Sequence, residues 1–186
     1  MPIVEAHILE GYSPDEKSRL TAALTDAIRF VVPADDEAVT VMVHEMAPEN
    51  YARGGLSRSP APALPDPVEI ALNFLKALEA RNIDTAKAML ATGFRMVFPG
   101  AKSMATIAEL IDWAKDRYRF VEKTITSTQA FHKDGCAFVY VIGTLSGEWP
   151  NGDPFEGIRF IDRFEINGGK IVSQEVWNDI AEERAK

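Results

Sequence analysis

The sequence has one cysteine, Cys136, and it lacks any apolar run of the roughly 20 residues that span a bilayer. A single cysteine cannot form a disulfide within the chain, so we expect a reducing compartment. No basic segment precedes an apolar stretch at the N-terminus, so we expect no signal peptide and a cytoplasmic location. The net charge of −8 argues against a nucleic-acid backbone or an anionic membrane as a partner.

Several motifs of catalytic and cofactor sites are also missing. The chain has no Gly-rich phosphate loop and no serine or cysteine nucleophile motif. Its three histidines, His7, His44 and His132, lie in different expected elements, and no group of His, Cys and Asp has metal-ligand spacing. The sequence therefore predicts neither a metal nor a cofactor.

What is present indicates a globular chain in two parts. A hydrophobic fraction of 46% and a length of 186 residues fit one ordinary domain or two small ones. Two glycines followed by closely spaced prolines fill residues 54–65, a composition that continues neither a helix nor a central strand. We predict a domain at 1–55, a linker at 56–66 and a second domain at 67–186.

The first segment has the pattern of a β-α-β unit. An apolar, β-branched run at 3–9 predicts a strand, and a second strand is expected at 38–44. Between them, Ser13 and Glu16 form a capping box that begins a helix. Two strands joined by a long helix should be parallel. Some 50 residues of this kind bury too little by themselves, so the unit should pair with copies of itself or with the second segment.

Four stretches of this segment, 2–11, 27–28, 41–46 and 51–55, together resemble the 4-oxalocrotonate tautomerase family. The resemblance implies that Pro2 becomes the amino-terminal residue when Met1 is removed. By the same resemblance, Pro2 acts as a general base, or in some branches as a general acid, and moves a proton in an enol or dienol acid.

The segment also departs from the family pattern. Well-known members carry one substrate-binding arginine after the first strand and another in the second strand, where this sequence has Tyr12 and Thr40. By the same resemblance, Tyr12 and Thr40 are expected to contact the substrate. Tyr12 could instead donate a hydrogen bond to a substrate carbonyl or enolate. Tyr51 takes the place of an aromatic wall residue. Arg53 is either a substrate-binding cation from a neighbouring subunit or a solvated loop residue.

The second segment reads as helices followed by a strand meander. Asp66 and Thr106 are expected caps of two helices, with a short helix at 84–90 and a strand at 94–98 between them. Four strand-like runs separated by turns follow, at 120–131, 137–146, 155–166 and 170–179. This order predicts helices packed on one face of a curved antiparallel sheet.

Three stretches of it, 98–100, 164–171 and 177–179, resemble the SnoaL-like polyketide cyclases of the nuclear transport factor two superfamily. That resemblance implies a cone-shaped α+β barrel with an apolar cavity. Some members are cyclases, isomerases or epoxide hydrolases that use an aspartate in the cavity. Others serve only as binding or dimerisation modules.

Alternation along the strands suggests which side chains enter that cavity. We expect Asp162 to face inward and Asp179 and Trp177 to share an inward face of the last strand. A carboxylate among aromatic side chains would have a raised pKa and could act as an acid or base. For Asp162, a plain salt bridge with Arg159 or Arg163 is the simpler alternative.

Three functional hypotheses remain open. The first is a tautomerase-type isomerase of small enol or α-keto compounds that uses Pro2, fused to a SnoaL-like ligand-binding domain. The second places a cyclase or isomerase in the SnoaL-like cavity and leaves the first domain as an assembly unit, and the third is a non-catalytic binding module. Combining the assemblies implied by the two resemblances predicts a homo-hexamer, with a dimer as the alternative.

Overall fold

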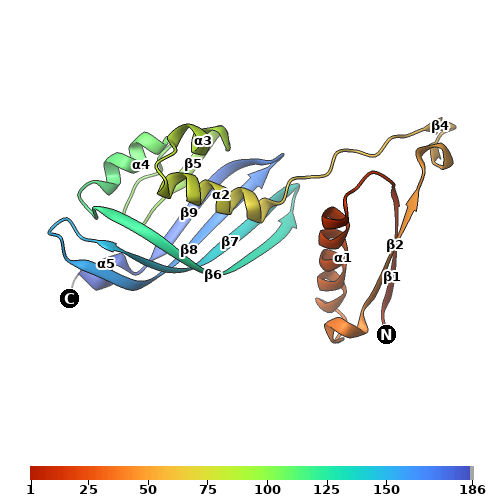
Figure 1. Ribbon diagram of the computed structural model, residues 1–186, viewed down its shortest axis with the longest axis horizontal. Coiled ribbons are helices and arrows are strands. Elements are labelled where there is room, and N and C mark those ends of the chain that lie inside the picture. The colour runs from red at the N-terminus through yellow and green to blue at the C-terminus, as the bar shows by residue number, and fades with distance from the viewer. Residues whose placement is uncertain (185–186) are drawn as a thin grey trace. The chain divides into compact units, whose positions relative to one another are not determined.

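The computed structural model describes residues 1–184, and the chain divides into two compact units, Met1–Ala63 and Leu64–Lys186 (Figure 1). We call them the N-terminal and the C-terminal unit. The prediction of two domains with mixed α+β content is confirmed. The last two residues of the predicted second domain, 185–186, lie outside the described residues. Within residues 1–184, every helix is too short or too polar to cross a bilayer.

The N-terminal unit is the predicted β-α-β motif. Strand β1 (Ile3–Leu9) pairs in parallel with β2 (Thr40–Met46), and α1 (Pro14–Arg29) connects them. The predicted capping box is present, because the Glu16 backbone N–H donates to Ser13 Oγ and the Ser13 N–H donates to Glu16 Oε2 at 2.7 Å. These two bonds satisfy amide groups that would otherwise lack partners at the helix N-terminus.

A small hairpin follows the second strand. Gly54 and Gly55 make its turn with φ of 63° and 78°, a left-handed conformation that glycine adopts without steric cost. The second strand of this hairpin, Leu56–Ser57, falls at the start of the predicted linker. The short elements of this region are η1 (Asp36–Ala38), η2 (Pro48–Asn50), β3 (Ala52–Arg53) and β4 (Leu56–Ser57).

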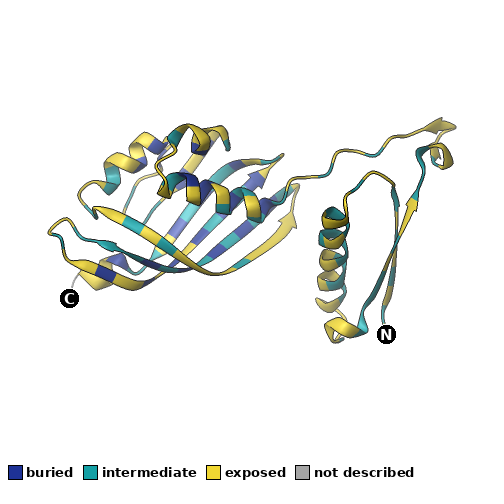
Figure 2. Ribbon diagram, in the orientation of Figure 1, coloured by how far each residue is buried: buried dark blue, intermediate teal, exposed yellow. Residues whose placement is uncertain are grey.

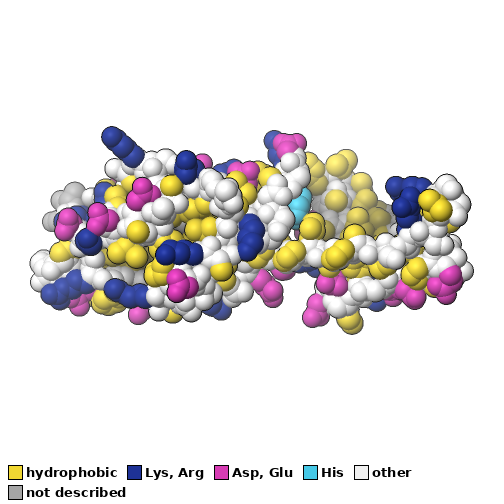
Figure 3. All heavy atoms as spheres, turned by 90° about the horizontal axis from the view of Figure 1, so that it is seen from above, with side chains coloured by type: hydrophobic (Ala, Val, Ile, Leu, Met, Phe, Trp, Pro, Cys, Tyr) yellow, Lys and Arg dark blue, Asp and Glu magenta, His cyan; other side chains and the backbone are white. Residues whose placement is uncertain are grey.

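The N-terminal unit has no interior of its own. Residues 1–63 are all described, and none of them is buried (Figure 2). Apolar side chains instead reach the surface, including Phe30, which is 91% exposed, and Ile3, which is 61% exposed. Hydrophobic side chains are accordingly open to view in the space-filling picture (Figure 3). A stable form of this unit therefore needs another surface to cover its apolar groups.

The C-terminal unit is a five-stranded curved sheet with helices α2 to α4 over one face (Figure 1). Its strands lie in the order β5-β9-β8-β7-β6. The strands are β5 (Leu90–Val97), β6 (Phe120–Lys133), β7 (Cys136–Glu148), β8 (Pro154–Asn167) and β9 (Lys170–Asn178). The helices are α2 (Pro67–Glu79), α3 (Ile83–Ala88), α4 (Ile107–Ala114) and α5 (Ile180–Arg184).

One edge of this sheet differs from the prediction of a wholly antiparallel sheet. The last four strands are antiparallel neighbours, but β5 pairs in parallel with β9. After β5 the chain continues through α4 and enters the sheet again at the opposite edge, in β6. The first strand of the unit thus lies beside the last, and this contact is too distant in sequence to be read from local patterns.

The core lies between the sheet and α2. Phe74 of α2 packs edge-on against Phe164 of β8, with ring centroids 6.0 Å apart, and neither side chain is accessible to solvent. Phe160 is also buried. These aromatic contacts hold the helix on the sheet and surround the polar residues described next.

Candidate functional sites

Pro2 lies at the start of β1, directly beside the start of β2. Its carbonyl oxygen accepts a hydrogen bond from the Thr40 backbone N–H at 3.0 Å, and the parallel ladder continues with Ile3 opposite Thr40. Pro2 is half-buried, whereas Met1 is 90% exposed. The structure thus brings together two of the residues expected to form a site, Pro2 and Thr40.

The other three expected residues of the N-terminal unit lie beyond the far end of the strands. Tyr12 follows β1, and Tyr51 and Arg53 follow β2. The seven residues of β1 extend for roughly 23 Å, so these side chains are remote from Pro2 of the same chain. The structure therefore does not bring them to Pro2 within one chain.

Tyr12 also has a partner already. Its hydroxyl donates a hydrogen bond to the Ala61 carbonyl oxygen at 3.0 Å. Tyr51 is half-buried, and Arg53 is exposed on β3. Because the Tyr12 proton is in use, donation to a substrate oxygen would require this bond to break.

In the C-terminal unit, Asp162 is the most enclosed polar group. It lies on β8 between Phe160 and Phe164 and is completely inaccessible to solvent, as the alternation predicts. Its Oδ2 accepts a hydrogen bond from Lys123 Nζ at 2.7 Å, while its Oδ1 has no partner. A buried carboxylate with a free oxygen is a costly arrangement and is typical of functional sites.

The expected salt bridge of Asp162 with its sequence neighbours is wrong. Arg159 pairs with Asp179 at 2.6 Å, and Arg163 pairs with Glu175 at 3.5 Å. Side chains of adjacent residues on a strand point to opposite faces, so Arg163 cannot follow Asp162 inward. The true partner, Lys123, comes from β6.

Burial raises the pKa of the Asp162 carboxyl, and the Lys123 ammonium and the Gln174 amide oppose this rise by favouring the charged form. Burial also raises the pKa of the Tyr118 hydroxyl. The Arg117 charge lowers that pKa, and the nearby Asp162 charge raises it further. Lys123 additionally lies over the Phe160 ring, with Nζ 3.8 Å from its centroid. The arrangement is a charge-assisted hydrogen bond from the Lys123 ammonium group to a buried carboxylate.

Sequence reasoning missed three members of this cluster: Lys123, Tyr118 and Gln174. One pattern could have indicated Lys123: it lies two residues after Val121 on β6, so both side chains point to the same, inward face. Gln174 is 1% exposed, but no local pattern indicated this. The alternation of inward and outward side chains along β9 shifts by one residue part way along the strand.

That change also corrects the expected positions of Trp177 and Asp179. The pairing of β8 with β9 shifts between Glu165 and Ile166, which leaves Val172 without an opposite residue. A residue inserted in this way reverses which side chains face inward beyond it. Trp177 is consequently 51% exposed, and Asp179 pairs with an exposed arginine outside the cluster.

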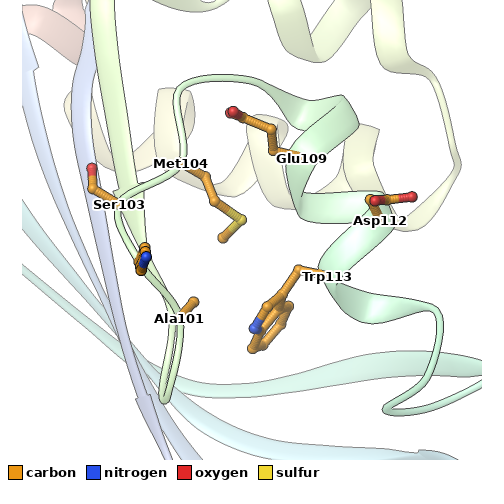
Figure 4. A pocket seen from close by; sticks show the side chains of 7 residues that line it. Ala101, Ser103, Met104, Glu109, Asp112 and Trp113 are labelled. Carbon is orange, nitrogen blue, oxygen red and sulfur yellow. The ribbon is translucent and has the colours of Figure 1, made fainter.

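A separate pocket of about 360 Å³ lies between α4 and the segment that precedes it (Figure 4). Met104 and Trp113 point into it, and the buried Trp113 indole nitrogen has no hydrogen-bond partner. The Glu109 carboxylate is committed to capping α4, since the Ala105 and Thr106 backbone N–H groups donate to it and lower its pKa. Asp162 does not line this pocket, whose charged groups are Lys102, Glu109 and Asp112. The Asp112 carboxylate is paired with Lys115, so the pocket is separate from the buried Asp162 cluster.

Two family models match the chain, each over one unit. The family described as "Tautomerase enzyme" matches residues 2–59, and the family described as "SnoaL-like domain" matches residues 71–174. A probable tautomerase of Staphylococcus aureus is 36% identical over 59 residues, which are 32% of this chain and 97% of that protein. A probable tautomerase of Staphylococcus epidermidis has the same identity and coverage.

Solved structures resemble the C-terminal unit. An NTF2-like protein of unknown function from Burkholderia pseudomallei superposes with a TM-score of 0.53 at 16% identity, over 63% of this chain and 94% of that one. TerC, co-crystallised with polyporic acid, gives a TM-score of 0.53 at 13% identity, over 63% and 95% of the two chains. At these identities the similarity establishes the fold.

Proposed function

This chain belongs to the tautomerase family through residues 2–59 and to the SnoaL-like family through residues 71–174, and on that premise we propose that it is an isomerase whose N-terminal unit tautomerises a small enol or α-keto compound. Pro2 is the general base. The C-terminal unit binds a related ligand or stabilises the assembly. The family membership supports the isomerase class, and the assignment of Pro2 rests on its place in the strand.

The observation that carries the proposal is the position of Pro2. It stands directly before β1, is held by the hydrogen bond from Thr40 N–H, and is the first residue of the tautomerase match. Removal of the exposed Met1 would leave a secondary amine at the edge of the two-stranded sheet. Apolar surroundings or neighbouring cations would lower the pKa of that amine and make it a base near neutral pH.

The chemistry needs no redox step. The Pro2 nitrogen takes the proton from the enol hydroxyl. The C=O bond forms, and the electron pair of the C=C bond moves to the carbon that does not carry the oxygen. The protonated Pro2 then returns the proton to that carbon, so that the product is an isomer of the substrate. A cation or hydrogen-bond donor at the oxygen would stabilise the negative charge that develops between the two transfers.

The donors of such a site would come from a second copy of the chain. Tyr12, Tyr51 and Arg53 lie at the end of the strands opposite Pro2, so a complete site would combine Pro2 and Thr40 of one copy with these residues of its neighbour. Arg53 would bind a carboxylate, Tyr51 would form an apolar wall, and Tyr12 would act once its bond to Ala61 opens. We propose a hexamer, with a dimer as the smaller alternative, since the unit has no interior of its own.

The test combines intact mass with kinetics. The purified protein should lack Met1, and Pro2→Ala should lower kcat/KM for ketonisation of phenylpyruvate enol or 2-hydroxymuconate by about 10²–10⁴-fold, the range for loss of a general base. Pro14→Ala, which changes the first residue of α1, is the matched control and should keep wild-type activity. Retained Met1 together with full activity would refute the role of Pro2.

A second candidate function rests on the buried pair of Asp162 and Lys123. Their cluster could exchange a proton with a ligand of the SnoaL-like fold, as a cyclase or isomerase would require. In that case Asp162→Asn would abolish turnover while Pro2→Ala would not. If the wild type itself shows no turnover, the remaining hypothesis is a binding module.

A further inference from the structure

The open face of the N-terminal sheet carries a cluster of metal-ligating side chains. Glu5 and His7 lie two residues apart on β1, so their side chains point to the same face. His44 on β2 is directly opposite His7 in the parallel register. Among residues 1–184, these three form the group of His, Cys and carboxylate side chains that lies close enough to hold one ion.

The three side chains are close together and unobstructed. Their candidate ligand atoms all lie within 4.8 Å of one another, and His7 Nε2 is 3.9 Å from Glu5 Oε2. The two imidazole rings stack with centroids 4.8 Å apart and an angle of 17° between their planes. Within the single chain all three residues are exposed, so no packed neighbour of the same chain fixes their rotamers.

We propose that Glu5, His7 and His44 form a binding site for a first-row divalent transition metal ion such as Zn²⁺. Metal–ligand bonds of about 2.0–2.2 Å place two ligands of one ion roughly 3–3.5 Å apart. Small side-chain rotations bring the present separations into that range, and they cost little at exposed positions. Water would fill the remaining coordination positions.

The donor set determines the class of ion. Two imidazole nitrogens and one carboxylate favour Zn²⁺, Ni²⁺ or Cu²⁺ over Mg²⁺ and Ca²⁺, which prefer oxygen ligands. The site is separate from the proposed base, because His7 lies five residues along the strand from Pro2, a distance of about 16 Å. The proposal is therefore independent of the proposed tautomerase activity.

A bound ion would have a structural consequence in this unit. It would join β1 to β2, the two strands of a sheet whose unit has no buried side chain. Binding to the folded state alone stabilises that state. Zn²⁺ should therefore raise the temperature at which the N-terminal unit unfolds.

The test is calorimetric titration of the full-length protein, without a polyhistidine tag, with ZnCl₂ at neutral pH. The wild type should bind one ion per chain, and His7→Ala and His44→Ala should each weaken binding by about tenfold or more. Glu5→Gln should weaken it less, because one of three ligands is replaced by a neutral oxygen. MgCl₂ should give no binding heat.

His132→Ala is the matched control, since it removes the exposed histidine of the C-terminal unit and should bind Zn²⁺ like the wild type. His7→Gln and His44→Gln keep a polar side chain at each position, so they test the site even if an alanine variant fails to fold or assemble. Absence of Zn²⁺ binding in the wild type, or unchanged binding in both histidine-to-glutamine variants, would overturn the proposal.

Discussion

The two units of this chain differ in where their apolar side chains go. In the C-terminal unit, Phe74, Phe160 and Phe164 are removed from water between a helix and the sheet. In the N-terminal unit, no residue from 1 to 63 is buried, and Phe30 is 91% exposed. A β-α-β unit has one helix for two strands, so one face of its sheet has no helix of its own to cover it. The comparison implies that the first unit needs contacts outside itself, which the proposed oligomer would supply, and that the second has a core of its own.

The strongest test compares a buried and an exposed phenylalanine. Phe164→Ala should destabilise the C-terminal unit by about 3–5 kcal/mol, because it removes a fully buried ring and leaves a cavity. Phe30→Ala should change stability by no more than about 0.5 kcal/mol if its ring stays in water. Denaturant unfolding followed by far-UV circular dichroism measures both. An equal loss at Phe30 would mean that another copy covers this residue.

The next test compares the ion pairs of the two units. Lys123→Met should cost about 3–5 kcal/mol at neutral pH, because it leaves the buried Asp162 without its partner. Lys17→Met breaks the pair with Glu45, whose side chains are about a third exposed, and should cost only about 0.2–1 kcal/mol. The same unfolding measurement separates them. A small loss for Lys123→Met would show that Asp162 is already neutral in the folded state.

Dilution should separate the units directly. All three tryptophans lie in the C-terminal unit, so their fluorescence reports its unfolding, whereas circular dichroism reports both units. Each tenfold dilution weakens association by about 1.4 kcal/mol, so the N-terminal unit should unfold at a lower temperature as the protein is diluted. If the unfolding temperature of the N-terminal unit does not change with protein concentration, the unit does not depend on other copies.

The pH dependence should identify the cost of burying Asp162. Its folded-state pKa is raised above the ordinary value of 3.8, so the folded protein binds more protons than the unfolded chain at pH values between these two. The free energy of unfolding contributed by this group therefore falls as the pH rises through that window. The Asp162→Asn variant lacks this titrating carboxyl. The free energy of unfolding of the variant, relative to that of the wild type, should therefore increase with pH from about 4 upward. Parallel pH profiles of the two proteins would argue against the raised pKa.

The smallest effects are expected at the helix caps. Ser13→Ala and Thr106→Ala each remove a side chain that accepts a hydrogen bond from a helix N-terminal amide, at a typical cost of about 1 kcal/mol. The local loss should be alike in the two units, because both caps are capping boxes. A much larger loss for Ser13→Ala would indicate that the cap also contributes to assembly.

Local patterns were sufficient for much of the fold. The capping boxes at Ser13 and Thr106 and the alternation that turns Asp162 inward were read correctly, because each depends on residues a few positions apart. The parallel pairing of the first two strands also followed from the helix between them. The parallel pairing of β5 with β9 did not, since it joins the two ends of the second unit.

The sites followed the same division. The sequence by itself determined that Pro2 precedes the first strand and that an aspartate lies among phenylalanines on an inner strand face. Only the tertiary structure decided that Lys123 is the partner of Asp162, that Trp177 faces outward and that His7 meets His44. The physical reason is that these contacts depend on strand register between distant segments. A single unpaired residue such as Val172 reverses the facing of all that follow, and no local pattern encodes it.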